Sequence, residues 1–189
     1  MRFMNIRALA CAFVLGFLPA CAQAETAVTV RVTLFGYADN DPPGTAIAHP
    51  RIHRGAAGQG TYNDPITFAA NPEQFAPGTM IYVPYLQKYF VMEDDCATAI
   101  KTASYGAPLI DLWAGGTASS NYNQLMAAES AYTRDSAQII VNPTADHPVK
   151  AAPIFADRST PREQVATREL SRRGDSWRDR LLAGRWPWF

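Results

Sequence analysis

The sequence has 189 residues, with 17 basic and 17 acidic side chains and 48% hydrophobic residues. This length favours one domain with an appendage over two full domains, and the hydrophobic content is normal for a soluble globular protein. The charge is distributed unevenly: residues 25–156 carry seven basic and twelve acidic side chains, whereas residues 157–189 carry eight arginines and five acids. The acidic body argues against nucleic acid as the main partner.

Residues 1–24 have the pattern of a signal peptide. Arg2 and Arg7 precede an apolar run, residues 8–18, that is too short to span a membrane, and Ala22-Gln23-Ala24 forms a cleavage site. In an alternative interpretation, Cys21 is the lipid-carrying cysteine of an outer-membrane lipoprotein. Either interpretation predicts a periplasmic or secreted protein.

Beyond this signal, short predicted strands alternate with turns, and one short helix is expected at residues 121–131. The expected strands are residues 28–35, 66–69, 79–84, 88–92, 109–113 and 137–141. A long loop, residues 37–60, follows the first strand. This pattern predicts an all-β domain, a small six-stranded barrel over residues 25–150. The lone mature cysteine, Cys96, is expected to be a buried apolar side chain.

Residues 151–189 are predicted to form a basic helical tail. Thr160 has the properties of a helix N-cap and Pro161 those of a first helical residue, and the helix carries an apolar face. This helix either packs on the barrel or contacts a polyanionic surface, such as a membrane or the cell wall. We expect the whole chain to be a monomer.

Three segments carry a family resemblance: residues 77–84 (PGTMIYVP), 95–101 (DCATAIK) and 110–116 (IDLWAGG). Together they resemble the double-psi β-barrel domains that act on cell-wall polysaccharides. These domains include the three-aspartate domain, the barrel of membrane-bound lytic transglycosylase A and the related rare lipoprotein A. The second segment lacks the glycines of the family motif. Asn71-Pro72 stands where the three-aspartate domain has an aspartate before proline.

The first predicted strand resembles a second group of barrels. Thr33, Phe35, Gly36 and Asp39 fit the expansin pattern T-x-Y-G-x-x-D. Expansins and the related family 45 endoglucanases also have an aspartate at the position of Asp111. Both resemblances therefore imply a double-psi barrel with a functional aspartate at this position.

The resemblance implies roles for particular side chains. Asp111 would protonate the glycosidic oxygen, which requires its pKa to rise from about 3.9 through burial or a neighbouring carboxylate. Asp95 or the adjacent Asp94 would supply that neighbour. Substrate contacts would come from Asp39, Tyr37, Tyr85, Lys101 and Trp113. Without the resemblance, Asp111 reads as a carboxylate that caps backbone amides inside the barrel.

The predicted function is cleavage of peptidoglycan by a lytic transglycosylase, which needs one carboxylate and no cofactor. An inverting hydrolase would need a second carboxylate, and Asp39 or Asp41 is the best candidate. His49 and His53 are four residues apart but have no obvious third partner, so no metal site is expected. The alternatives are a non-catalytic, expansin-like polysaccharide-binding module and an exported partner protein that uses the barrel only as a scaffold.

Overall fold

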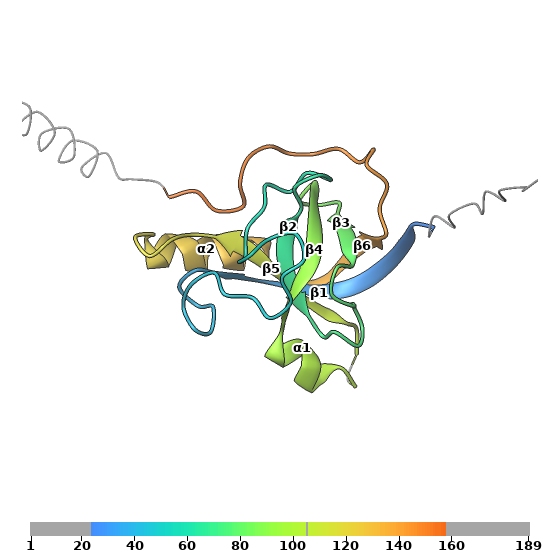
Figure 1. Cartoon of the computed structure of the whole chain (residues 1–189), viewed down its shortest axis with the longest axis horizontal. Helices are drawn as coiled ribbons and strands as arrows, with labels where there is room; N and C mark the ends of the chain where they lie inside the picture. The colour runs from blue at the N-terminus through green and yellow to red at the C-terminus, as the bar shows by residue number, and fades with distance from the viewer. Residues whose placement is uncertain (1–23, 105, 158–189) are drawn as a thin grey trace, which may run out of the picture.

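The computed structural model describes residues 24–104 and 106–157. The predicted signal peptide, including Cys21, lies almost entirely outside these residues, and so does the basic tail from residue 158 onward. The described part forms a closed six-stranded barrel with two helices (Figure 1). The strands are β1 (Thr26–Gly36), β2 (Ile66–Ala70), β3 (Met80–Val83), β4 (Lys88–Asp95), β5 (Leu109–Gly115) and β6 (Arg134–Val141). The helices are α1 (Ala97–Thr102) and α2 (Tyr122–Tyr132).

The order of strands around the barrel is β1-β5-β2-β4-β3-β6. Two neighbouring pairs, β1–β5 and β2–β4, are parallel, and the other four are antiparallel. Closure leaves no free sheet edge. The predicted all-β, six-stranded barrel is therefore confirmed, and each predicted strand coincides with one of the six observed.

Two details differ from the sequence-based prediction. Strand β4 continues three residues beyond Met92, because Ala69 and Ala70 pair with Asp94 and Asp95 after a shift in register. A second helix, α1, follows directly, so the one-helix prediction was incomplete. The Cys96 sulfur caps this helix by accepting a hydrogen bond from the Ala99 amide at 3.4 Å. Cys96 is buried, as predicted.

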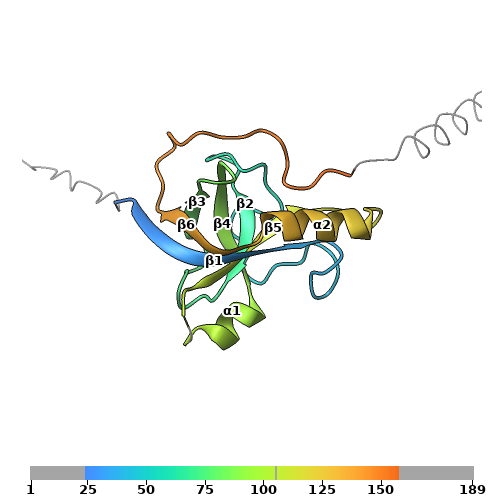
Figure 2. The same cartoon turned by 180° about the vertical axis from the view of Figure 1, so that it is seen from behind.

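The barrel core contains buried side chains from all six strands. Val30 and Val32 of β1, Phe68 of β2 and Phe90 of β4 are fully buried. Removing a side chain of this size from water contributes about 1.5–3 kcal/mol. Helix α1 projects from one end of the barrel, and the chain after β6 passes over the opposite end (Figures 1 and 2). In both views α2 lies beside the C-terminal half of β1.

The long loop between β1 and β2 is fastened to the barrel through Glu93 of β4. The Glu93 side chain is fully buried, and its Oε1 accepts hydrogen bonds from the amides of residues 51, 52 and 53 at 2.7–3.0 Å. Its Oε2 accepts from Thr67 Oγ1 at 2.9 Å and contacts His53 Nδ1 at 2.7 Å. This anchor fixes the path of the loop beside one end of the barrel.

In the described part of the chain, neither helix has the length and hydropathy needed to cross a bilayer.

Candidate active site

A cleft of about 610 Å³ lies between the β1–β2 loop and the barrel end that carries α1. It is lined by Phe35, Asp39, Asn40, Asp41, Ala46, Ile47, Ala48, Ala69, Asp94, Asp95, Cys96, Ala97, Thr98 and Asp111. Five of these side chains are carboxylic acids and none is lysine or arginine. A cleft of this size falls within the range of small-ligand sites. Of the eight predicted site residues, four line the cleft: Asp111, Asp95, Asp94 and Asp39.

Asp111 is placed by the middle of β5, which is hydrogen-bonded to strands on both sides. Its backbone is paired with Thr33 of β1 and with Ala69 of β2. The Thr33 hydroxyl donates a hydrogen bond to Asp111 Oδ1 at 2.8 Å, and no other side chain among the described residues donates to this carboxyl. No salt bridge within residues 24–104 and 106–157 involves Asp111. The side chain is therefore held at the cleft without a cation beside it.

These surroundings favour the protonated form of Asp111. Burial raises its pKa to about 6, although the hydrogen bond from Thr33 acts in the opposite direction. The negative charges of Asp39 and Asp94 contribute to this rise. At pH 6 about half of the Asp111 side chains would thus carry a proton, as a general acid requires.

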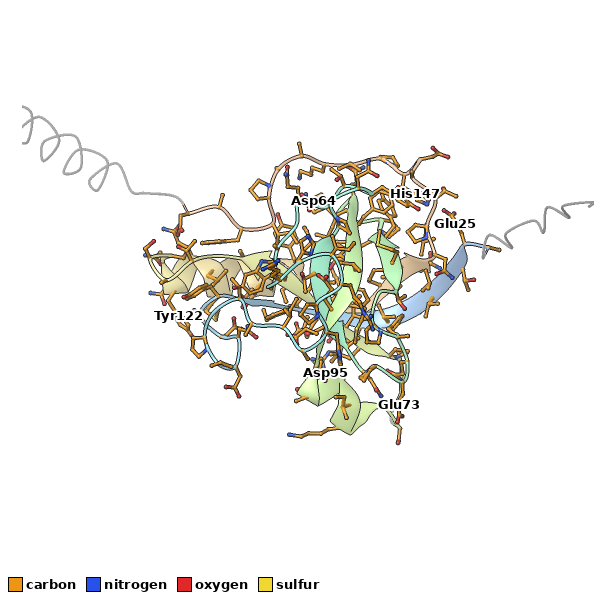
Figure 3. All side chains as sticks on the ribbon, in the orientation of Figure 1. Glu25, Asp64, Glu73, Asp95, Tyr122 and His147 are labelled. Carbon is orange, nitrogen blue, oxygen red and sulfur yellow. The ribbon has the colours of Figure 1, made fainter. Side chains whose placement is uncertain are left out.

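The two aspartates at the end of β4 have different partners. Asp94 Oδ1 accepts hydrogen bonds from the amides of Ala48 and Asp95, at 2.8 and 2.9 Å. Burial nevertheless raises the pKa of Asp94. Asp95 instead pairs with His49 Nε2 at 2.8 Å, and both side chains are partly exposed. Figure 3 shows Asp95 beside α1, at the opposite end of the barrel from Asp64 and His147. Together the two aspartates hold residues 48 and 49 of the loop at the edge of the cleft.

Asp39 reaches the cleft from the turn after β1. Its Oδ1 accepts a hydrogen bond from the Gly36 amide at 2.7 Å, which closes a tight local ring. The carboxyl then faces Asp111, whose pKa is raised by the Asp39 charge. The turn after β1 thus brings the Asp39 charge close enough to Asp111 to affect its titration.

A further acid, Glu129, completes this cluster and was missed by the sequence analysis. It lies on α2, and only 6% of its surface is exposed. Burial raises the pKa of Glu129 to about 8, with further contributions from the charges of Asp39 and Asp111 and from a hydrogen bond to Asp39. The available signal was its spacing: Glu129 lies four residues after Leu125, on the apolar face of the predicted helix.

The other predicted substrate contacts lie outside the lining of the cleft. Tyr37 packs against the core, and Lys101 is exposed on α1. The Tyr85 hydroxyl donates to the Tyr132 carbonyl at 2.8 Å, away from the carboxylates. Trp113 is buried edge-on against Phe35, with ring centroids 5.3 Å apart, and borders a separate apolar cavity of about 300 Å³. The strand pattern predicted that these aromatics flank the site region but not which way they point.

In the part of the chain that the structure describes, no three His, Cys, Asp or Glu side chains are arranged to hold a metal ion. The cleft acids act on one another through their charges and on the loop through hydrogen bonds. What this arrangement can do chemically is donate and accept protons in a partly enclosed cleft.

Comparison with known proteins gives the family. Residues 27–164 match the family described as the DDB_G0273701 N-terminal domain. A relative in Dictyostelium discoideum, "Uncharacterized protein DDB_G0273701/DDB_G0273221", is 35% identical over 144 residues, which are 76% of this chain. The matched segment covers 63% of that relative's length. No solved structure matches the chain. Because the match spans more than half of the chain and includes all but the first residue of the barrel, the protein belongs to the DDB_G0273701 N-terminal domain family.

Proposed function

We propose that the protein is an exported glycan-cleaving enzyme, a lytic transglycosylase, with Asp111 as its general acid and base. The observation that carries this proposal is the environment of Asp111 and its effect on the protonation of that side chain. It lines a cleft of about 610 Å³, has no cationic partner among the described residues, and has a pKa raised to about 6. Strongly perturbed acids in clefts are typical of catalytic groups. The resemblance to double-psi barrels of cell-wall enzymes, carried by residues 77–116, supports the same role.

The reaction needs one carboxyl group in two protonation states. Protonated Asp111 donates its proton to the glycosidic oxygen as the bond between that oxygen and C1 breaks. The leaving sugar departs with a new hydroxyl group, and positive charge develops at C1 of the retained sugar. The Asp111 carboxylate then takes the proton of the retained sugar's 6-hydroxyl as that oxygen bonds to C1. A 1,6-anhydro ring forms, no water is consumed, and Asp111 is protonated again.

The neighbouring acids support this cycle. The charges of Asp39 and Asp94 favour the proton on Asp111 before the reaction, and they stabilise positive charge at C1 during it. If one of them instead activates water, the product is a reducing sugar rather than an anhydro sugar. The chemical form of the product therefore distinguishes a lytic transglycosylase from a hydrolase.

The negative charge of the cleft limits which glycans can be substrates. Five carboxylic acids and no lysine or arginine line it, so a sugar with a free carboxylate beside the cleaved bond would be repelled. Peptidoglycan whose muramic carboxyls are closed as amides with the peptide stem satisfies this condition. A neutral glycan of the same linkage geometry satisfies it as well. Denuded peptidoglycan, with its free lactyl carboxylates, should be a poorer substrate.

The test is product analysis with matched variants. The mature protein is incubated with intact peptidoglycan at pH 5.5, and soluble products are analysed by mass spectrometry for anhydro-muropeptides. We expect Asp111→Asn to lower the rate by about 1000-fold, within the range for loss of a general acid. Asp135→Asn is the control, because Asp135 is 94% exposed on β6 and does not line the cleft. It should retain the wild-type rate.

Two outcomes would overturn the enzymatic proposal. Binding of the glycan without new products would favour the expansin-like binding module instead. Full activity of Asp111→Asn would show that another group donates the proton. The proposal also requires export, which the pattern of residues 1–24 predicts and which fractionation of the producing cells would test.

A further inference from the structure

Glu129 occupies a position that a helix normally gives to an apolar residue. Helix α2 packs on β1 and β5, and its two buried residues are Leu125 and Glu129. They are four positions apart, so they lie on the same face of the helix. Leu125 fills this face with apolar contacts, whereas Glu129 places a carboxyl group there. Burying a carboxyl group destabilises the folded state unless the group is neutral or well hydrogen-bonded. A carboxyl at this position therefore indicates a role other than packing.

Gly36, the last residue of β1, provides the space for this carboxyl. A Cβ atom at Gly36 would lie 2.9 Å from Glu129 Oε1 and 2.8 Å from Leu125 Cδ2, closer than real side chains approach. The Gly36 amide does not bind Glu129, because it donates to Asp39 Oδ1 at 2.7 Å. The same glycine therefore admits Glu129 on one side and fixes Asp39 on the other.

The Glu129 carboxyl has one evident partner. Its Oε1 is buried and accepts no hydrogen bond from any donor in the described residues, and no salt bridge in residues 24–104 and 106–157 reaches it. The charged groups that face it are the carboxyls of Asp39, after β1, and Asp111, on β5. Two carboxyl groups can share a hydrogen bond only when one of them carries a proton. Glu129 is the more buried of the two, and Asp39 is exposed and already accepts a hydrogen bond from the Gly36 amide, so Glu129 is the member that holds the proton.

We propose that Glu129 is a positioning residue, whose protonated carboxyl donates a hydrogen bond to Asp39 and holds the Asp39 carboxylate toward Asp111 at the cleft. The inference rests on the proposed function for its effect on catalysis. The contacts of Glu129, Gly36 and Asp39 stand without it. Burial and the two neighbouring charges raise the pKa of Glu129 to about 8, which keeps this proton in place at neutral pH.

The consequence concerns how Asp111 titrates. The Asp39 charge helps to raise the pKa of Asp111 to about 6. Asp39 is an exposed residue, so without the donor on Glu129 its carboxyl loses one of the two hydrogen bonds that fix it and can swing away from Asp111. Its charge then acts on Asp111 over a longer distance through water, and the pKa of Asp111 falls toward its ordinary value. The pH range in which Asp111 is a competent acid therefore moves downward.

Two variants of similar size separate positioning from packing. Glu129→Gln keeps a hydrogen-bond donor at the same place, whereas Glu129→Met keeps the volume and removes the donor. We expect Glu129→Gln to retain the wild-type kcat and pH profile. We expect Glu129→Met to lower kcat about tenfold with little change in KM, and to shift the alkaline limb of the profile down by about half a pH unit. Circular dichroism and thermal unfolding verify that both variants are folded.

A measurement that needs no activity keeps the inference independent of the proposed reaction. Carboxyl carbon resonances of the wild-type protein are followed by NMR between pH 3 and 9. Glu129 should titrate above pH 7, and the midpoint of Asp111 should fall in Glu129→Met but not in Glu129→Gln. Titration of Glu129 below pH 5, or equal Asp111 midpoints in all three proteins, would overturn the positioning role. If these shifts occur in a protein without glycan-cleaving activity, the proposed function fails and the positioning inference stands.

Discussion

The molecule contains two buried acid clusters whose protonation is opposite. Glu93 on β4 is fully buried, yet its pKa is lowered: burial acts to raise it, but hydrogen bonds from the amides of residues 51–53 and from the His53 ring outweigh that effect. Asp111 on β5 is also largely removed from water, and its pKa is raised to about 6, because burial is opposed by one hydrogen bond, from Thr33. The two buried acids therefore differ in the number of donors that offset the effect of burial.

The two acids therefore have different roles in the molecule. A carboxylate with five donors is stabilised as an anion and anchors the β1–β2 loop, so it contributes to the fold. A carboxyl that has a single donor, faces other acids and lines a cleft can gain and lose a proton near neutral pH. Substitutions should therefore destabilise the protein at Glu93 and stabilise it at Asp111.

The largest effect on stability is expected at Glu93. Glu93→Gln replaces one acceptor oxygen with an NH2 group and removes the charge, which leaves some of the three loop amides without a partner. Breaking a buried, charged hydrogen-bond network of this kind costs about 3–5 kcal/mol. Urea unfolding at pH 7 measures the change. A loss below about 1 kcal/mol would mean that the loop is held by other contacts.

The pH dependence of this anchor has a defined sign. The folded-state pKa of Glu93 is lowered, so its contribution is present above the unfolded value of 4.5 and is lost as the pH falls through the folded value. The pKa of His53 is raised, because its bonds to Glu93 and Asp64 outweigh the effect of burial. The His53 contribution is complete below pH 6.5 and is lost as the pH rises through its folded value. The anchor is therefore strongest in the mildly acidic range.

The second effect, with the opposite sign, is expected at Asp111. Its folded pKa of about 6 exceeds the ordinary 3.8, so ionisation destabilises the folded state and stability falls as the pH rises from about 4 to 6. The difference of about 2 pKa units corresponds to about 3 kcal/mol at pH 7. Asp111→Asn removes the charge but buries an amide, so we expect a net gain of about 1–2 kcal/mol at pH 7.

Measurement at two pH values isolates the Asp111 effect. Urea unfolding of Asp111→Asn and of the wild type should give a gain at pH 7 that disappears or reverses near pH 4, where Asp111 is already neutral in the folded protein. A gain of the same size at both pH values would show that packing, and not charge, separates the two proteins.

The positions of the strands could be predicted from the sequence, but the protonation of the buried acids could not. The position of the first strand followed from the alternation of apolar and polar residues, and those of the others from short apolar runs between turn residues. Asp111 stood out as a carboxyl within an apolar strand, and the motif resemblance singled it out. The protonation of an acid, however, depends on donors brought together by tertiary pairing, such as Thr33 beside Asp111, 78 positions apart. For the same reason Glu93, which lies just beyond the predicted strand 88–92, and Glu129, within the predicted helix, were not singled out.

A smaller loss of stability is expected from Gly36→Ala, which tests the packing of α2 on β1. The added methyl group would lie within 3 Å of Leu125 Cδ2 and Glu129 Oε1, so the helix has to shift. Overpacking of this kind costs about 1–3 kcal/mol. Because Glu129 moves away from Asp39, the variant should also resemble Glu129→Met in its pH profile. The matched control is Gly106→Ala: nothing lies within 4 Å of a Cβ there, so its cost comes from the positive φ of +82° alone. If both variants have the wild-type pH profile of activity, then a shift of α2 does not affect the titration of Asp111.

The smallest effect is expected from the partly exposed pair of Asp95 and His49 at the edge of the cleft. Their 2.8 Å contact is open to solvent on both sides, and pairs of this kind contribute less than about 1 kcal/mol. A double-mutant cycle with Asp95→Asn and His49→Gln should therefore give a small coupling energy. Both single variants should retain activity within about tenfold, because Asp95 touches the loop and not the protonated acid. Loss of activity in Asp95→Asn equal to that in Asp111→Asn would contradict the division between the two sites. In that case the proton donor would be Asp95, at the rim of the cleft. It would not be Asp111, in the strand interior, where burial and two neighbouring charges raise the pKa.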